Sequence, residues 1–131
     1  MFKEIYGWIV IGGISGHGSV KYSYNTAGIK CINKNELKEE EQSKYIYIGG
    51  ISGQGTIGYS FNSGNVTYVN SEDNMEQRAD IYSGGITGQG SVNDSYNTGD
   101  ISNITKNAGA SYVAGITANG VATNSYNTGN V

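Results

Sequence analysis

Proline is absent from this 131-residue sequence, and cysteine and histidine occur once each. A lone cysteine cannot form an internal disulfide, and a lone histidine without other ligands does not make a metal site. No signal peptide is visible at residues 1–8, and no apolar run is long enough to span a bilayer. The net charge is −3, which argues against nucleic-acid binding. We therefore expect no nucleic-acid partner and no membrane insertion.

Apolar side chains are also scarce, since only 37% of the residues are hydrophobic and 21 are glycine. This is little material for a conventional globular core. The sequence instead repeats one glycine-rich phrase four times, and the copies begin at Ile11, Ile48, Ser83 and Val113. Groups that recur at every level are typical of a stacked repeat, whereas a catalytic site needs different groups that converge once. The sequence therefore predicts a repeat protein.

The repeat has a fixed length within each copy and a variable length between copies. A serine follows the second small residue of the glycine doublet by ten positions in every copy, as from Gly13 to Ser23. The interval between these serines falls from 37 to 35 to 30 residues. Charged residues avoid the copies and gather between them, which indicates packed blocks and solvated loops. We divide the single domain, residues 1–131, into repeat blocks 9–29, 46–66, 81–101 and 111–131 and loops 30–45, 67–80 and 102–110.

Alignment of the blocks places aliphatic residues in three columns. These are Ile14, Ile51, Ile86 and Ile116; Val20, Ile57, Val92 and Ala122; and Ile29, Val66, Ile101 and Val131. Turn signals separate the columns, so each coil is predicted to hold three short strands that pair in parallel with their copies about 4.8 Å away. The crossover rule favours a right-handed winding. The predicted fold is all-β, a right-handed parallel β-solenoid (β-helix) of about four coils.

Polar and aromatic positions recur in the same way and are predicted to form ladders along the stack. An asparagine amide can bond its own backbone and the next amide, and an aromatic ring can stack on its copy. Phenylalanine replaces tyrosine once in the aromatic column, so the ring rather than the hydroxyl is what that column needs. The ladders are Asn25, Asn62, Asn97 and Asn127, and Tyr24, Phe61, Tyr96 and Tyr126. Glycine recurs at Gly18, Gly55, Gly90 and Gly120, where a positive φ or a close backbone approach is expected.

The repeated phrase resembles a known family. Gly-Gly-Ile-x-Gly, then Gly-x-Val or Gly-x-Ile, then Ser-Tyr-Asn-Thr-Gly-Asn-Val is similar to the GLUG repeats of bacterial surface proteins, and the resemblance covers all four blocks. The sequence differs from these repeats at two kinds of position. Serines such as Ser23 stand where the repeats often have cysteine, and Ala27, Ala114 and Ala118 replace glycine. The resemblance implies a β-solenoid in a secreted or surface-anchored protein of adhesin-like or surface-protease-associated architecture. Binding or stalk roles are commoner in such proteins than catalysis.

Candidate chemistry is weak in every case. His17 aligns with uncharged amides and is interpreted as a surface turn residue. Cys31 stands alone and is interpreted as a small loop or wall residue. Residues 53–58 match a dinucleotide fingerprint without the helix that it requires, and the aspartate of calcium-binding β-rolls is missing. Asp94 aligns with tyrosine and asparagine, so no ladder of acids for glycoside cleavage exists. The sequence predicts no enzyme, no metal site and no cofactor.

We therefore expect a non-catalytic structural or binding module, either an adhesin-like stalk or a ligand-presenting solenoid, of a bacterial cell-surface or secreted protein. The expected partners are a host or cell-surface protein or a glycan. One alternative is a self-assembling subunit whose terminal coils stack end to end on copies of itself, and another is a fragment of a carbohydrate-active β-helix protein. The sequence ends with a repeat block at Val131, without a polar cap, which fits a fragment of a longer protein or a stacking subunit.

Overall fold

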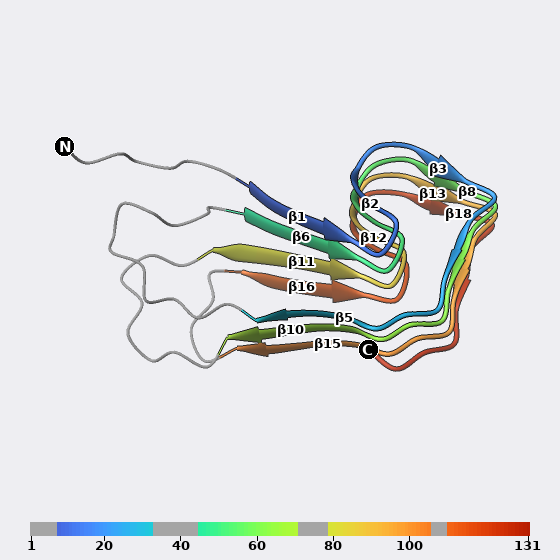
Figure 1. The fold of residues 1–131 in the computed structure, drawn as a ribbon. Helices are drawn as coiled ribbons and strands as arrows, with labels where there is room; N and C mark the ends of the chain where they lie inside the picture. Colours follow the sequence, from blue (N-terminus) through green and yellow to red (C-terminus); the bar gives the residue numbers. More distant parts are fainter. Residues whose placement is uncertain (1–7, 33–44, 71–78, 106–109) are drawn as a thin grey trace.

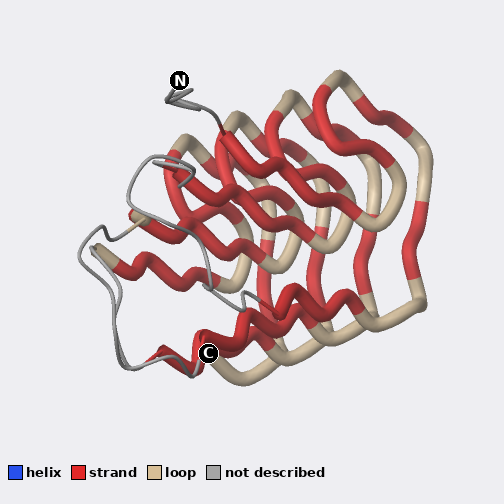
Figure 2. Tube along the Cα trace, turned by 60° about the vertical axis from the view of Figure 1, so that its left-hand side comes forward, coloured by secondary structure: helices blue, strands red, loops and turns tan. Residues whose placement is uncertain are grey.

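The computed structural model describes residues 8–32, 45–70, 79–105 and 110–131. These residues contain strands and turns and no helix. They form four coils, one per described range, that lie one behind the next so that equivalent strands are neighbours (Figure 1, Figure 2). Every strand pair in them is parallel and in register with the next copy of the repeat, as Ile46 is with Ile81. The predicted parallel β-solenoid of about four coils is confirmed.

The described residues of a coil hold up to five short strands, where three were predicted. The strands build five sheets. The first sheet contains β1 (Trp8–Gly12), β6 (Tyr45–Gly49), β11 (Asp80–Gly84) and β16 (Ser111–Ala114). The second contains β2 (Ser15–His17), β7 (Ser52–Gln54), β12 (Thr87–Gln89) and β17 (Thr117–Asn119).

The other three sheets complete the coil. The third contains β3 (Val20–Lys21), β8 (Ile57–Gly58), β13 (Val92–Asn93) and β18 (Ala122–Thr123). The fourth contains β4 (Tyr24–Asn25), β9 (Phe61–Asn62), β14 (Tyr96–Asn97) and β19 (Tyr126–Asn127). The fifth contains β5 (Ile29–Ile32), β10 (Val66–Asn70) and β15 (Ile101–Thr105).

Two apolar clusters fill the interior. The larger joins the first sheet to the fifth, which run beside each other in Figure 1. Its buried members are Ile46, Ile48, Val66, Tyr68, Ala79, Ile81 and Ile101. The smaller joins the bend after the first sheet to the third sheet and contains Val20, Ile51, Ile57, Ile86 and Val92, with Ile116 against it. Because neighbouring coils bury one another, these few aliphatics suffice.

The column that contains Ile51 lies in a bend rather than on a strand, which corrects its predicted position. The N–H of Ile51 donates to the carbonyl of Ile86 at 2.9 Å, so the coils still pair there. Ile51 and Ile86 are fully buried, Ile116 is half-buried, and Ile14 in the first coil is 46% exposed. The second column lies in the third sheet, and the third column begins the fifth sheet at Ile29, Val66 and Ile101.

The strands of the fifth sheet run past the predicted block ends, so the predicted loops 30–45, 67–80 and 102–110 start too early. In β10, Val66, Tyr68 and Asn70 are buried while Thr67 and Val69 are half-buried. This alternation is a strand pattern that continues four residues beyond the repeated phrase. The first sheet also begins earlier than predicted, at Tyr45 and Asp80. The remaining loop residues, 33–44, 71–78 and 106–109, lie outside the described part of the chain.

The recurrent glycine at Gly55 is required by close approach of the backbone. A Cβ built on Gly55 would lie 1.8 Å from the carbonyl oxygen of Gly18, and one on Gly90 would lie 1.8 Å from that of Gly55. No side chain fits at such a distance. Gly18 and Gly90 also have positive φ angles of 145° and 137°. Positive φ and close backbone approach, the two expected reasons for this glycine column, therefore both occur. The close approach is found in every coil after the first.

Candidate functional site

The asparagine column is a continuous hydrogen-bonded ladder. The Nδ2 of Asn25 donates to Oδ1 of Asn62 at 2.9 Å, Asn62 donates to Asn97 at 2.7 Å, and Asn97 donates to Asn127 at 2.7 Å. Each amide also bonds its own turn, as when Nδ2 of Asn62 donates to the carbonyl of Gly64 at 2.7 Å. Asn62 and Asn97 are fully buried. Because these amides bond one another inside the coil, they are not available to a ligand.

A serine ladder runs beside the asparagines and was not predicted. The N–H of Ser23 donates to Oγ of Ser60 at 3.2 Å, and Ser60 repeats the contact with Ser95 at 3.1 Å. Each hydroxyl in turn donates to a carbonyl two residues earlier, as Ser60 does to Gly58 at 2.8 Å. The recurrence of serine at the same position in all four blocks was the signal for this role.

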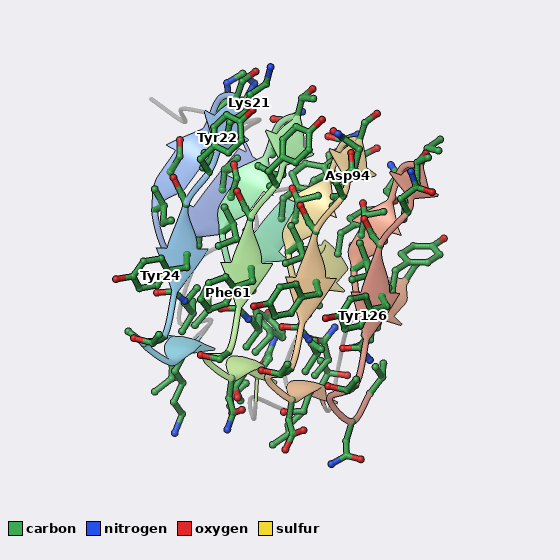
Figure 3. All side chains as sticks on the ribbon, turned by 90° about the vertical axis from the view of Figure 1, so that its right-hand side faces the viewer. Lys21, Tyr22, Tyr24, Phe61, Asp94 and Tyr126 are labelled. Atoms are coloured by element: carbon green, nitrogen blue, oxygen red, sulfur yellow. The ribbon has the colours of Figure 1, made fainter. Side chains whose placement is uncertain are left out.

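The predicted aromatic column is a row of stacked rings on the outer side of the fourth sheet (Figure 3). Ring centroids are 5.1 Å apart for Tyr24 and Phe61, 5.0 Å for Phe61 and Tyr96, and 5.2 Å for Tyr96 and Tyr126, with planes within 7° of parallel. The two outer rings are exposed and the two inner ones half-buried. The inner rings have both faces against neighbours, so the row presents ring edges to solvent.

A second, shorter aromatic row lies at the corner between the third and fourth sheets. The rings of Tyr22 and Tyr59 stack at 5.0 Å with planes 10° apart. The column continues as Asp94 and Asn124, and all four residues have φ between 47° and 53°, in the left-handed region. The ring pair was not predicted, because the column holds tyrosine in only two of its four positions. We call the two rows together the aromatic face: Tyr22, Tyr59, Tyr24, Phe61, Tyr96 and Tyr126.

A third row of tyrosines lies on the first sheet. Tyr47 and Tyr82 stack at 5.1 Å, and Tyr82 and Tyr112 stack at 4.7 Å. Burial raises the pKa of Tyr47 and of Tyr82, and neighbouring tyrosines and Asp80 raise the pKa of both further. The signal for this row was the alternation Tyr45-Ile46-Tyr47-Ile48, in which the isoleucines point to the core and the tyrosines to the other side.

Within the described ranges, no group of three or more His, Cys, Asp or Glu side chains is placed to hold a metal ion. Burial raises the pKa of the Cys31 thiol, which disfavours the nucleophilic thiolate. Oδ1 of Asp100 accepts from the N–H of Asn130 at 2.8 Å, a contact between coils. His17 pairs with Gln54 in the second sheet, and Nε2 of Gln54 donates to Oε1 of Gln89 at 2.6 Å.

The fold and its ladders define a parallel β-solenoid repeat protein. Comparison with protein-family models, with curated proteins and with solved structures gave no match. The resemblance to GLUG repeats therefore rests on the motif in the sequence. No helix among the described residues is long and apolar enough to cross a membrane.

Proposed function

We propose that the chain is a non-catalytic binding and stalk module of a bacterial cell-surface or secreted protein, and that it binds a protein or glycan through the aromatic face. The observation that carries the proposal is that the repeated side chains contact their equivalents in neighbouring coils, along the axis of the stack. Asparagines, serines and rings each contact their own copy in the next coil, as Asn62 contacts Asn97. Such contacts build a stiff rod with one repeated surface, whereas catalysis requires unlike groups that meet at one place.

The exposed composition of the aromatic face suits protein recognition. Tyrosine provides a large, amphipathic contact area with little conformational entropy to lose. Tyr22, Tyr24, Tyr59 and Tyr126 are all more than half exposed. Exposed apolar surface of this kind marks interaction sites in soluble proteins.

The test is a binding screen against glycan and surface-protein arrays with the parent chain and two matched variants. Tyr24→Ser with Tyr126→Ser removes two of the four exposed rings of the aromatic face, and Tyr112→Ser removes an exposed ring from the first sheet. We expect a reproducible set of ligands that the double variant loses and the Tyr112 variant keeps, with no chemical change in any ligand by mass spectrometry. Equal binding by all three proteins, or conversion of a ligand, would overturn the proposal.

End-to-end self-assembly is a second candidate, supported by the polarity of the ladders. Asn25, Asn62 and Asn97 each donate to the ladder asparagine of the next coil, so Asn25 has no asparagine donor and Asn127 no asparagine acceptor among the described residues. A coil of a second copy at either end would supply the missing partner at that end. Sedimentation over a concentration series tests this candidate, because a Thr128→Pro variant removes an N–H that pairs with Asn97 and disturbs the terminal edge. Oligomers that this variant abolishes support assembly, and a monomeric parent contradicts it.

A further inference from the structure

The row formed by Tyr22 and Tyr59 stops in the middle of the stack. The equivalent residue in the third coil is Asp94, and Figure 3 shows Asp94 along the same edge as Tyr22. A third ring, if present, would stack about 5 Å beyond Tyr59, at the spacing of one coil. The aspartate side chain is shorter than that of tyrosine and carries no ring. Among the described residues, Tyr59 therefore has one ring face against Tyr22 and no aromatic neighbour on the other, and it is 51% exposed.

The backbone at this corner indicates that the two tyrosines are not there for local conformational reasons. Aspartate and asparagine tolerate the left-handed region well, but a bulky residue such as tyrosine is an outlier there. Tyr22 and Tyr59 nevertheless have φ angles of 53° and 50°. Residues held in sparsely populated backbone regions concentrate at binding and active sites. The strain is thus an observation independent of the ring geometry.

The carboxylate of Asp94 is held in place and retains acceptor capacity. Oδ2 accepts from Nδ2 of Asn93 at 3.0 Å, and Oδ1 lies 3.4 Å from Nδ2 of Asn124. A carboxylate has about four lone-pair positions, so about two remain for a ligand. The side chain is exposed. A negatively charged acceptor pair therefore lies one coil from the open face of an aromatic ring.

We propose that Tyr59 and Asp94 form a recognition site for an arginine side chain of a partner protein. The guanidinium group is planar, stacks on aromatic faces and pairs with a carboxylate through two parallel hydrogen bonds. It fits the place of the missing third ring, with one face on Tyr59 and its edge on Asp94. Lysine offers a compact charge that cannot do both. The inference rests on the proposed binding function and names the chemistry of one contact within it.

Three multivalent peptides, identical except for arginine, lysine or citrulline at one position, test the site by surface plasmon resonance when they flow over the densely immobilised chain. Multivalent peptides and a dense surface are needed because a single exposed cation–π contact is weak and the chain carries one such site. We expect the arginine peptide to bind at least about tenfold more tightly than the citrulline peptide, which has the same shape without the charge. Lysine should fall clearly below arginine. Equal binding of arginine and citrulline, or of arginine and lysine, would overturn the proposal.

Matched variants separate this site from general electrostatics. Asp94→Asn and Asp100→Asn change the net charge equally, and asparagine is suited to the left-handed backbone at position 94. We expect Asp94→Asn to abolish the arginine preference and Asp100→Asn to keep it. Tyr59→Phe should keep the preference and Tyr59→Ala should lose it. Equal losses from both aspartate variants would contradict the site, and array ligands that still bind through Tyr24 and Tyr126 would leave the broader function standing.

Discussion

Nδ2 of Asn62 donates to Oδ1 of Asn97 at 2.7 Å, between two side chains that are both fully buried. Asn62 also accepts from Asn25 and bonds both the N–H and the carbonyl of Gly64. One amide thus satisfies donors and acceptors in three coils. The interior of the stack depends on this polar ladder as much as on its aliphatic clusters, because a buried polar group that loses its partner keeps its full desolvation cost.

The first prediction concerns this ladder. Asn62→Ala should lower the free energy of unfolding by about 3 kcal/mol, because it removes one hydrogen bond from Asn25, one from Asn97 and two from Gly64 in the buried interior. Urea denaturation measures the change. Asn119→Ala, at an exposed position of β17, is the control and should shift stability by less than about 0.5 kcal/mol. Similar losses in both variants would show that the ladder adds nothing to stability.

The second prediction concerns the glycine column. Gly55→Ala should destabilise the stack by about 3 kcal/mol, because its Cβ would lie 1.8 Å from the carbonyl oxygen of Gly18 and the coils must move apart. Gly16→Ala is the control, since the nearest atom to its Cβ would be the carbonyl oxygen of Val10 at 3.4 Å. Thermal melts compare the two. A Gly55 variant that melts with the parent would contradict the close approach of the coils.

The third prediction compares two equivalent isoleucines, one in the second coil and one in the first. Ile51→Asp should abolish cooperative unfolding, because Ile51 is fully buried and the carboxylate would have no partner there. Ile14 is the equivalent residue of the first coil and is 46% exposed, so Ile14→Asp should leave a cooperative unfolding transition. Circular dichroism during heating measures both. If Ile14→Asp were as damaging as Ile51→Asp, the difference in burial between the coils would be wrong.

The fourth prediction concerns alkaline pH. The pKa values of Tyr47 and Tyr82 are raised in the folded state above the ordinary value of 10.0, chiefly by burial. Folding therefore favours the neutral phenols, so their contribution is constant below that ordinary value and is lost as pH rises through the raised pKa values. Melting temperature should fall more steeply above pH 10 in the parent than in a Tyr47→Phe, Tyr82→Phe variant. Below about pH 9 the two pH profiles should be parallel. Parallel profiles throughout would contradict the raised pKa values.

Periodicity allowed much of the fold to be predicted. Four copies of one phrase require equivalent residues to stack, which led to the parallel solenoid and to the columns of Asn62 and Phe61. The strand count was wrong because strands were predicted only at the aliphatic columns. Ile51 lies in a bend after Gly50, and none of the aliphatic columns lies in the first, second or fourth sheet. The block ends were wrong because Tyr68 and Asn70 continue the strand beyond the repeated phrase. The sequence does not repeat there, so the alignment of the blocks could not detect the extension.

The sequence by itself determined the stacking, because a residue that recurs at a fixed interval lies against its own copy once the coils are parallel. Only the tertiary structure decided which columns meet across a coil and which backbone conformation each corner takes. Val66 and Ile46 belong to one buried cluster although they stand in different segments of the repeat. Tyr59 and Asp94 share a left-handed corner that neither residue type reveals in sequence. Those relationships depend on how the five sheets close around the interior, and that closure is set by contacts between segments that the repeat period does not encode.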